Sequence, residues 1–237
     1  MKKYMVLILL TAIAIPMTAQ QEKNHDVSSE VKELTEFHDV IYQIWHTAWP
    51  EKNMDLLKSF STPVEKGYER IKKAKLPGIL RDKKAKWEDE LKKFGVTVEA
   101  YKVAASKNNL NALLNAAEKL HSQYESLVRV TKPVLKEVDE FHKVLYLLYH
   151  YYMPENNSAG IKEAAASLTE KMEMLSKAPL TSKLKAREEQ FNKARTELGA
   201  AVENLNNEIK DGKGKDDINK AVDALHAKYQ ELEKVFD

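Results

Sequence analysis

The sequence predicts an all-α protein made of two tandem up-down-up-down four-helix bundles related by internal duplication. Seven Gly and seven Pro in 237 residues, with 31% charged and 43% apolar residues, are typical of a chain rich in helix formers. Apolar residues recur at helical spacing. A pattern also recurs after about 104 residues. A period this long indicates a duplicated domain, because solenoid repeats run to about 20 to 50 residues.

The repeat is clearest in the segment that begins at Glu36. Of the 18 positions from Glu36 to Asn53, nine are identical in residues 140–157. One added residue then aligns Leu120 and His121 with Leu225 and His226 in the second copy. We therefore expect one bundle in residues 28–131 and a second in residues 132–237.

Apolar spacing and the breaks between apolar segments predict four helices in each copy. The first copy is expected to have helices at 28–48, 51–75, 80–106 and 109–130. The second copy is expected to have them at 133–152, 157–177, 182–210 and 216–236. Such short connections make neighbouring helices antiparallel. Pro63 lies inside the second helix and has Ser167 as its counterpart, so a kink is expected in the first copy only.

The N-terminus has the pattern of a secretory signal peptide. Lys2 and Lys3 precede an apolar run at residues 5–15, and Ala19 suits a cleavage site. Residues 1–19 are therefore expected to be removed, leaving a flexible segment at 20–27 and a periplasmic or secreted protein. The apolar run is shorter than the roughly 20 residues that span a bilayer, so no membrane insertion is expected after cleavage.

Charge and motifs exclude several functions. Loss of Lys2 and Lys3 takes the formal net charge from +2 to about zero, so a nucleic-acid partner is not expected. The chain has no cysteine, which excludes disulfides, thiolate ligands and covalent haem attachment. Phosphate-binding loops and common hydrolase motifs are also absent, so the sequence does not predict an enzyme.

The histidines are the candidate ligands, because six of the seven recur between the copies. The pairs are His38 with His142, His46 with His150, and His121 with His226. Within the first copy, His38 lies early in the first helix and His121 lies late in the antiparallel fourth helix. The two imidazoles are therefore expected at similar heights, at the edge of the apolar stripe. The same reasoning pairs His142 with His226.

His46 and His150 are secondary candidates as metal ligands. Helical phase directs them away from the apolar stripe, which favours an exposed or interdomain position. His38 and His46 are about 12 Å apart along a helix, so they cannot bind one ion together. A histidine at the edge of a bundle core can also be a packing residue, and this alternative stays open for all these positions.

Each half of the chain resembles the periplasmic four-helix cytochromes, namely the soluble b-type bundle cytochrome and the cytochromes c prime. The resemblance rests on helix count, loop placement and the pattern from Leu120 through His121 to Tyr124. It implies that His121 and His226 are axial ligands of a metal. This chain offers His38 and His142 where the b-type family has methionine, and it lacks the CxxCH motif of the c-type family.

Two functions follow as hypotheses. The first is binding of haem b, or of a divalent metal such as zinc or copper, by His38, His121, His142 and His226. Haem needs an axial pair and an apolar slot, which Phe37, Ile41, Leu120 and Tyr124 are expected to supply. The alternative is a non-catalytic interaction module, scaffold or chaperone-like, with a protein partner and no ligand.

Overall fold

The computed structural model describes residues 25–132 and 135–236, and this part of the chain is helical without any strand. The predicted all-α class is therefore confirmed. The predicted signal peptide at 1–19 and residues 20–24 lie outside the described residues. No helix in the described part is both long and apolar enough to cross a lipid bilayer.

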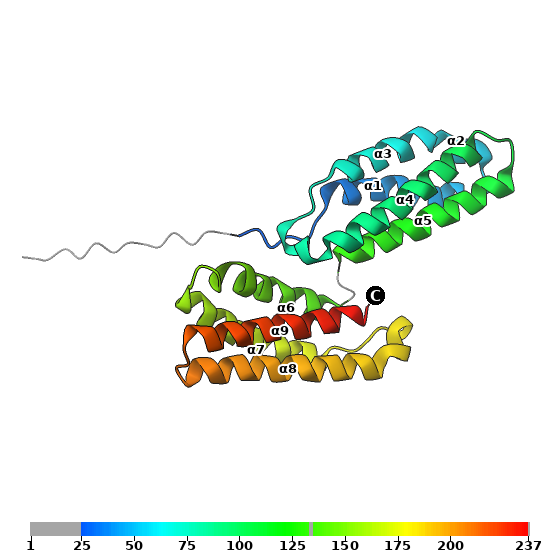
Figure 1. The fold of residues 1–237 in the computed structure, drawn as a ribbon. Coiled ribbons are helices and arrows are strands. Elements are labelled where there is room, and N and C mark those ends of the chain that lie inside the picture. Colours follow the sequence, from blue (N-terminus) through cyan, green and yellow to red (C-terminus); the bar gives the residue numbers. More distant parts are fainter. Residues whose placement is uncertain (1–24, 133–134, 237) are drawn as a thin grey trace, which may run out of the picture.

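The helices form two groups that lie one against the other (Figure 1). We call residues 25–132 the N-terminal unit and residues 135–236 the C-terminal unit. The N-terminal unit contains α1 (Lys32–Gln43), the π-helical turn η1 (Ile44–Ala48), α2 (Met54–Ser59), α3 (Ser61–Lys73), the 3₁₀ turn η2 (Gly78–Lys83), α4 (Lys84–Ala105) and α5 (Leu110–Thr131). The C-terminal unit contains α6 (Lys136–Leu147), the π-helical turn η3 (Leu148–Tyr152), α7 (Ser158–Lys177), the 3₁₀ turn η4 (Ser182–Arg187), α8 (Glu188–Lys210) and α9 (Lys215–Lys234).

Three of these helices have an asparagine as the N-cap residue. Asn53, Asn109 and Asn157 each accept a hydrogen bond of 3.0 Å from the backbone N–H three residues later, which satisfies a donor that the first helical turn leaves unpaired. The helix expected at residues 51–75, where Pro63 predicts a kink, is divided in the structure. Pro63 cannot donate to the Ser59 carbonyl, and the helix is interrupted between α2 and α3, whereas α7 is continuous.

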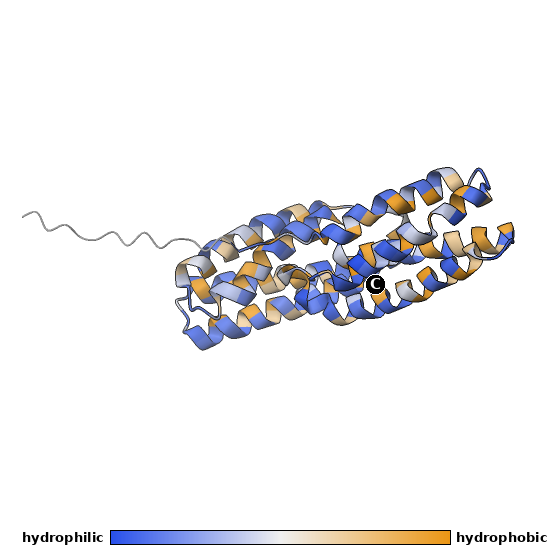
Figure 2. Cartoon of the chain, turned by 90° about the horizontal axis from the view of Figure 1, so that it is seen from above, coloured by the Kyte–Doolittle hydropathy of each residue, from blue (hydrophilic) through white to orange (hydrophobic). Residues whose placement is uncertain are grey.

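Each unit has its own hydrophobic core. One core comprises buried residues between Val31 and Val130, and the other comprises buried residues between Leu135 and Val235. Figure 2 shows that hydrophobic and hydrophilic residues both occur along the helices, as expected when each helix buries one face. A third, smaller cluster contains Ile79 and Leu80 of η2 and Tyr146 of α6, so it joins the two units.

The two π-helical turns lie 104 residues apart and were not predicted. In a π-helical turn the backbone hydrogen bond spans five residues instead of four, which rotates the following side chains relative to an α-helix. The helices predicted at 28–48 and 133–152 are therefore not α-helical throughout, since they contain η1 and η3.

A candidate metal centre between the two units

Three side chains from three elements meet where the two units touch. His150 comes from η3 and His226 from α9, both in the C-terminal unit, whereas Asp82 comes from η2 in the N-terminal unit. One ligand atom from each residue lies within 4.8 Å of the others. Within the described residues this is the only group of three or more His, Cys, Asp or Glu side chains that meets this distance limit.

Asp82 is the centre of this group. Its Oδ2 atom lies 3.0 Å from His226 Nε2, at hydrogen-bond distance, and 3.7 Å from His150 Nε2. The two imidazole rings meet edge to face, with their centroids 6.0 Å apart. The three side chains thus direct two nitrogens and one oxygen towards a common point.

The imidazole of His226 is held in place by Tyr149. The two rings are stacked with centroids 3.9 Å apart and an interplanar angle of 5°. His226 is buried, and the side chain of His150 is 15% exposed. The π-helical turn η3 carries both Tyr149 and His150, so it supplies the stacking partner and the second imidazole together.

Packing and hydrogen bonds hold the Asp82 turn against the C-terminal unit. Leu80 is buried against Tyr146, and Arg81 donates a hydrogen bond of 2.7 Å to the Tyr146 hydroxyl. The Arg81 guanidinium also lies over the Tyr146 ring, 5.1 Å from its centroid. The residues on either side of Asp82 are therefore anchored, since Lys83 forms an ion pair of 2.7 Å with Glu233 of α9.

The electrostatic environment favours the forms that bind metal. The hydrogen bond with His226 lowers the pKa of Asp82 more than partial burial of the carboxylate raises it. Burial lowers the pKa of His150, and the positive charge of Arg81 acts in the same direction. Asp82 is therefore an anion and His150 is a neutral imidazole at neutral pH, which are the states that ligate a metal ion.

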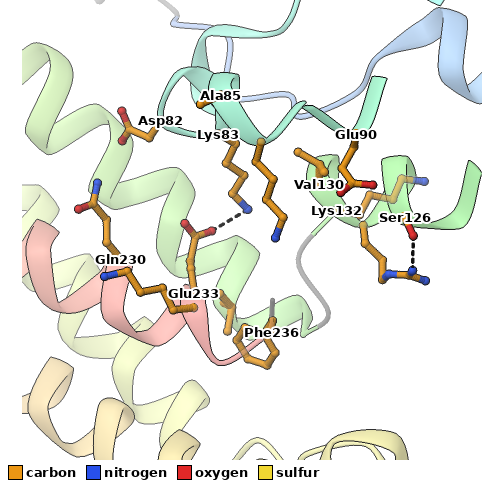
Figure 3. Close-up of a pocket in the computed structure, with 14 residues that line it drawn as sticks. Asp82, Lys83, Ala85, Glu90, Ser126, Val130, Lys132, Gln230, Glu233 and Phe236 are labelled. Atoms are coloured by element: carbon orange, nitrogen blue, oxygen red, sulfur yellow. Dashed lines mark hydrogen bonds and ion pairs between the residues drawn. The ribbon is translucent and has the colours of Figure 1, made fainter. Parts of the chain in front are cut away.

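Figure 3 shows the other side of the contact between the units. A cleft of about 480 Å³ lies there, lined by both units. Lys83 points into this cleft towards Glu233, and Asp82 also lines it. Asp82 and Lys83 are consecutive in η2, so one turn supplies the carboxylate of the candidate metal centre and an ion pair that stabilises the contact between the units.

The histidines predicted as primary ligands occupy different environments. His38 is exposed, with its ring tilted against Tyr124 at 6.3 Å. His121 stacks on Trp45 at 4.3 Å, and its side chain is 24% exposed. His142 is buried and stacks on Tyr229 at 4.7 Å, and burial lowers its pKa to about 4. His226 is the one primary candidate that belongs to the three-residue group.

The secondary candidates also differ from each other. His150 was expected at an exposed or interdomain position, and its Nε2 atom lies 3.7 Å from Asp82 Oδ2 at the junction of the two units. Its repeat counterpart His46 is exposed, and its ring is tilted against that of Tyr42 with centroids 4.5 Å apart. The structure therefore joins His226 to His150, whereas the sequence reasoning had paired His226 with His142.

The apolar slot expected for haem is filled by protein side chains. Phe37, Ile41, Leu120 and Tyr124 are each at most 3% exposed and belong to one packed core. A haem at this position would have to displace them, and a close-packed core resists such a change. The packing therefore favours a bare metal ion over haem.

Asp82 was missed by the sequence reasoning. The repeat aligns Leu80 with Leu184 and Arg81 with Lys185, but Asp82 with Ala186. An acidic residue present in one copy only was a usable signal that the two turns have different roles. Its partners could not be predicted, because the contact depends on how the two units pack.

Comparisons of the chain with protein-family models, with curated proteins and with solved structures gave no match. The function must therefore be inferred from the geometry of the candidate metal centre.

Proposed function

We propose that this protein binds a divalent transition-metal ion, zinc or copper, through Asp82, His150 and His226. The observation that carries the proposal is the convergence of two imidazole nitrogens and one carboxylate oxygen within 4.8 Å at a half-buried position. Imidazole and carboxylate ligands suit zinc, and imidazole also suits copper. Three protein ligands leave one position of a tetrahedral zinc ion for water or an external ligand.

The proposed ion joins two parts of the chain that are far apart in sequence. Asp82 belongs to the N-terminal unit and both histidines to the C-terminal unit, so an ion bound by all three would hold the units together. We further infer that each unit is an up-down-up-down four-helix bundle and that the two arose by duplication. The 104-residue repeat, the separate cores and the equivalent π-helical turns support this inference.

The proposed setting of this metal site is the periplasm or the cell exterior, as the signal-peptide pattern of residues 1–19 indicates. The resemblance to the four-helix cytochromes would then concern the arrangement of helices, with the metal bound elsewhere. Structural metal sites usually contribute directly to stability, and a site between two units would do so by strengthening their contact.

Isothermal titration calorimetry with zinc and with copper tests the proposal, using tag-free protein so that a histidine tag cannot bind the ion. Asp82→Asn keeps the size of the side chain but removes the anionic ligand, and we expect zinc affinity at this site to fall at least about tenfold. Asp89→Asn is the matched control, because Asp89 is exposed on α4 and pairs with Lys93. Equal zinc affinity in Asp82→Asn and the parent would contradict the proposal.

A further inference from the structure

The N-terminal unit contains counterparts of both histidines of the candidate metal centre. His46 and His121 are the repeat counterparts of His150 and His226. His121 stacks on Trp45 with an interplanar angle of 10°, just as His226 stacks on Tyr149 with an angle of 5°. In both units the stacking partner directly precedes the second histidine on a π-helical turn. Both units therefore present two histidines on the same pair of elements.

The carboxylate has a different origin in the N-terminal unit. Glu125 lies four residues after His121 on α5, and its Oε1 atom is 4.0 Å from His121 Nε2. Residues four apart lie on the same face of a helix, so Glu125 and His121 can bind one ion together. The counterpart of Glu125 in the C-terminal unit is Gln230, which carries no charge.

The two substitutions between the copies compensate each other. The C-terminal unit has Gln230 on its own helix and receives Asp82 from the neighbouring unit. The N-terminal unit has Glu125 on its own helix, and Ala186 replaces Asp82 in the second copy of the turn. Each histidine pair is thus accompanied by one carboxylate, although the carboxylate comes from a different element in each case.

We infer that His46, His121 and Glu125 form a second binding site for a divalent transition-metal ion. His46 is exposed, and the side chain of Glu125 is 45% exposed, so both can change rotamer to reach an ion beside His121. In the described structure the three ligand atoms do not meet the 4.8 Å limit that Asp82, His150 and His226 meet. Because these ligands must rearrange, the second site binds more weakly than the site between the units.

The second site has a different structural consequence from the first. All three of its ligands belong to the N-terminal unit, so an ion bound there does not connect the units. It lies on the surface, where Tyr42 beside His46 is 52% exposed. The ligand class is the same as in the proposed function, but the site depends on other residues and stands or fails independently.

Zinc stoichiometry measured by calorimetry and by elemental analysis after dialysis tests this inference on the full, tag-free chain. We expect two zinc ions per parent chain, with one lost in His121→Ala and the other lost in His226→Ala. One ion in the parent, lost in His226→Ala and kept in His121→Ala, would overturn the second site and leave the proposed function intact. Loss in His121→Ala alone would support the second site and refute the proposed function.

Glu125→Gln tests the carboxylate with little risk to folding, because it copies Gln230 of the other unit on an exposed helix face. We expect it to weaken the lower-affinity zinc ion at least about tenfold and to leave the higher-affinity ion unchanged. Glu118→Gln, an exposed change on the same helix, is the control. Unchanged binding of both ions in Glu125→Gln would overturn the assignment of Glu125 as a ligand.

Discussion

Acidification should destabilise the protein through His142. This imidazole is 6% exposed, stacks on Tyr229 at 4.7 Å and contacts the core of the C-terminal unit. Burial lowers its pKa to about 4, because the interior disfavours the imidazolium ion. In the unfolded chain the pKa of histidine is about 6.5. Between these values the unfolded state binds a proton that the folded state does not bind.

The sign and the size of the effect follow from this difference. The free energy of unfolding falls as the pH decreases through the range in which only the unfolded state is protonated. One pKa unit corresponds to about 1.36 kcal/mol. His142 alone should therefore remove about 2 kcal/mol of stability at pH 5 and about 3 kcal/mol at pH 4, relative to pH 8. The contribution is fully retained above pH 7.

Urea unfolding at several pH values between 8 and 4.5, in the presence of a chelator, measures this effect. His142→Gln removes the titrating group, and its stability should depend less on pH than that of the parent by the amounts above. His38→Gln, which removes an exposed imidazole, is the control and should keep the pH dependence of the parent. Equal pH dependence in His142→Gln and the parent would refute the reasoning.

Four further outcomes are expected. Gly67→Ala should destabilise the protein by about 1–3 kcal/mol in urea unfolding, because a Cβ atom there would overlap the buried Phe37 ring. Gly199→Ala should instead stabilise it by about 0.5–1 kcal/mol, since a Cβ there makes only ordinary contacts, and a loss of stability would contradict this reasoning. Tyr101→Phe should lower the free energy of unfolding by about 1 kcal/mol, because it removes the buried hydrogen bond of 2.6 Å that the Tyr101 hydroxyl donates to the Leu57 carbonyl. Unchanged stability would show that this bond contributes nothing. A heparin column should not retain the protein at physiological salt, because the chain without residues 1–19 has nearly equal numbers of acidic and basic residues. Salt-sensitive retention would argue for a polyanion partner.

The helices could be predicted because local signals specify them. Asn53, Asn109 and Asn157 cap helices next to the predicted breaks, and Pro63 lies where the second helix is interrupted. The π-helical turns could not be predicted, since no residue type marks them and periodicity was assessed at the α-helical repeat of 3.6 residues.

The candidate metal centre was predictable only in part. His226 and His150 were both recognised from the repeat, because their recurrence is visible within one chain. The third ligand was not recognised, since Asp82 reaches the site only through packing of the η2 turn on Tyr146. Contacts between two folded units depend on their surfaces, and a pattern within one helix holds no information about them.

The most direct test of the central proposal is an anomalous difference map at the zinc absorption edge, from crystals of the tag-free protein grown with zinc. We predict a peak at the junction of the two units, about 2.0–2.2 Å from Asp82 Oδ2, His150 Nε2 and His226 Nε2. A map with no peak between these three residues, in crystals whose zinc peaks lie elsewhere, would contradict it.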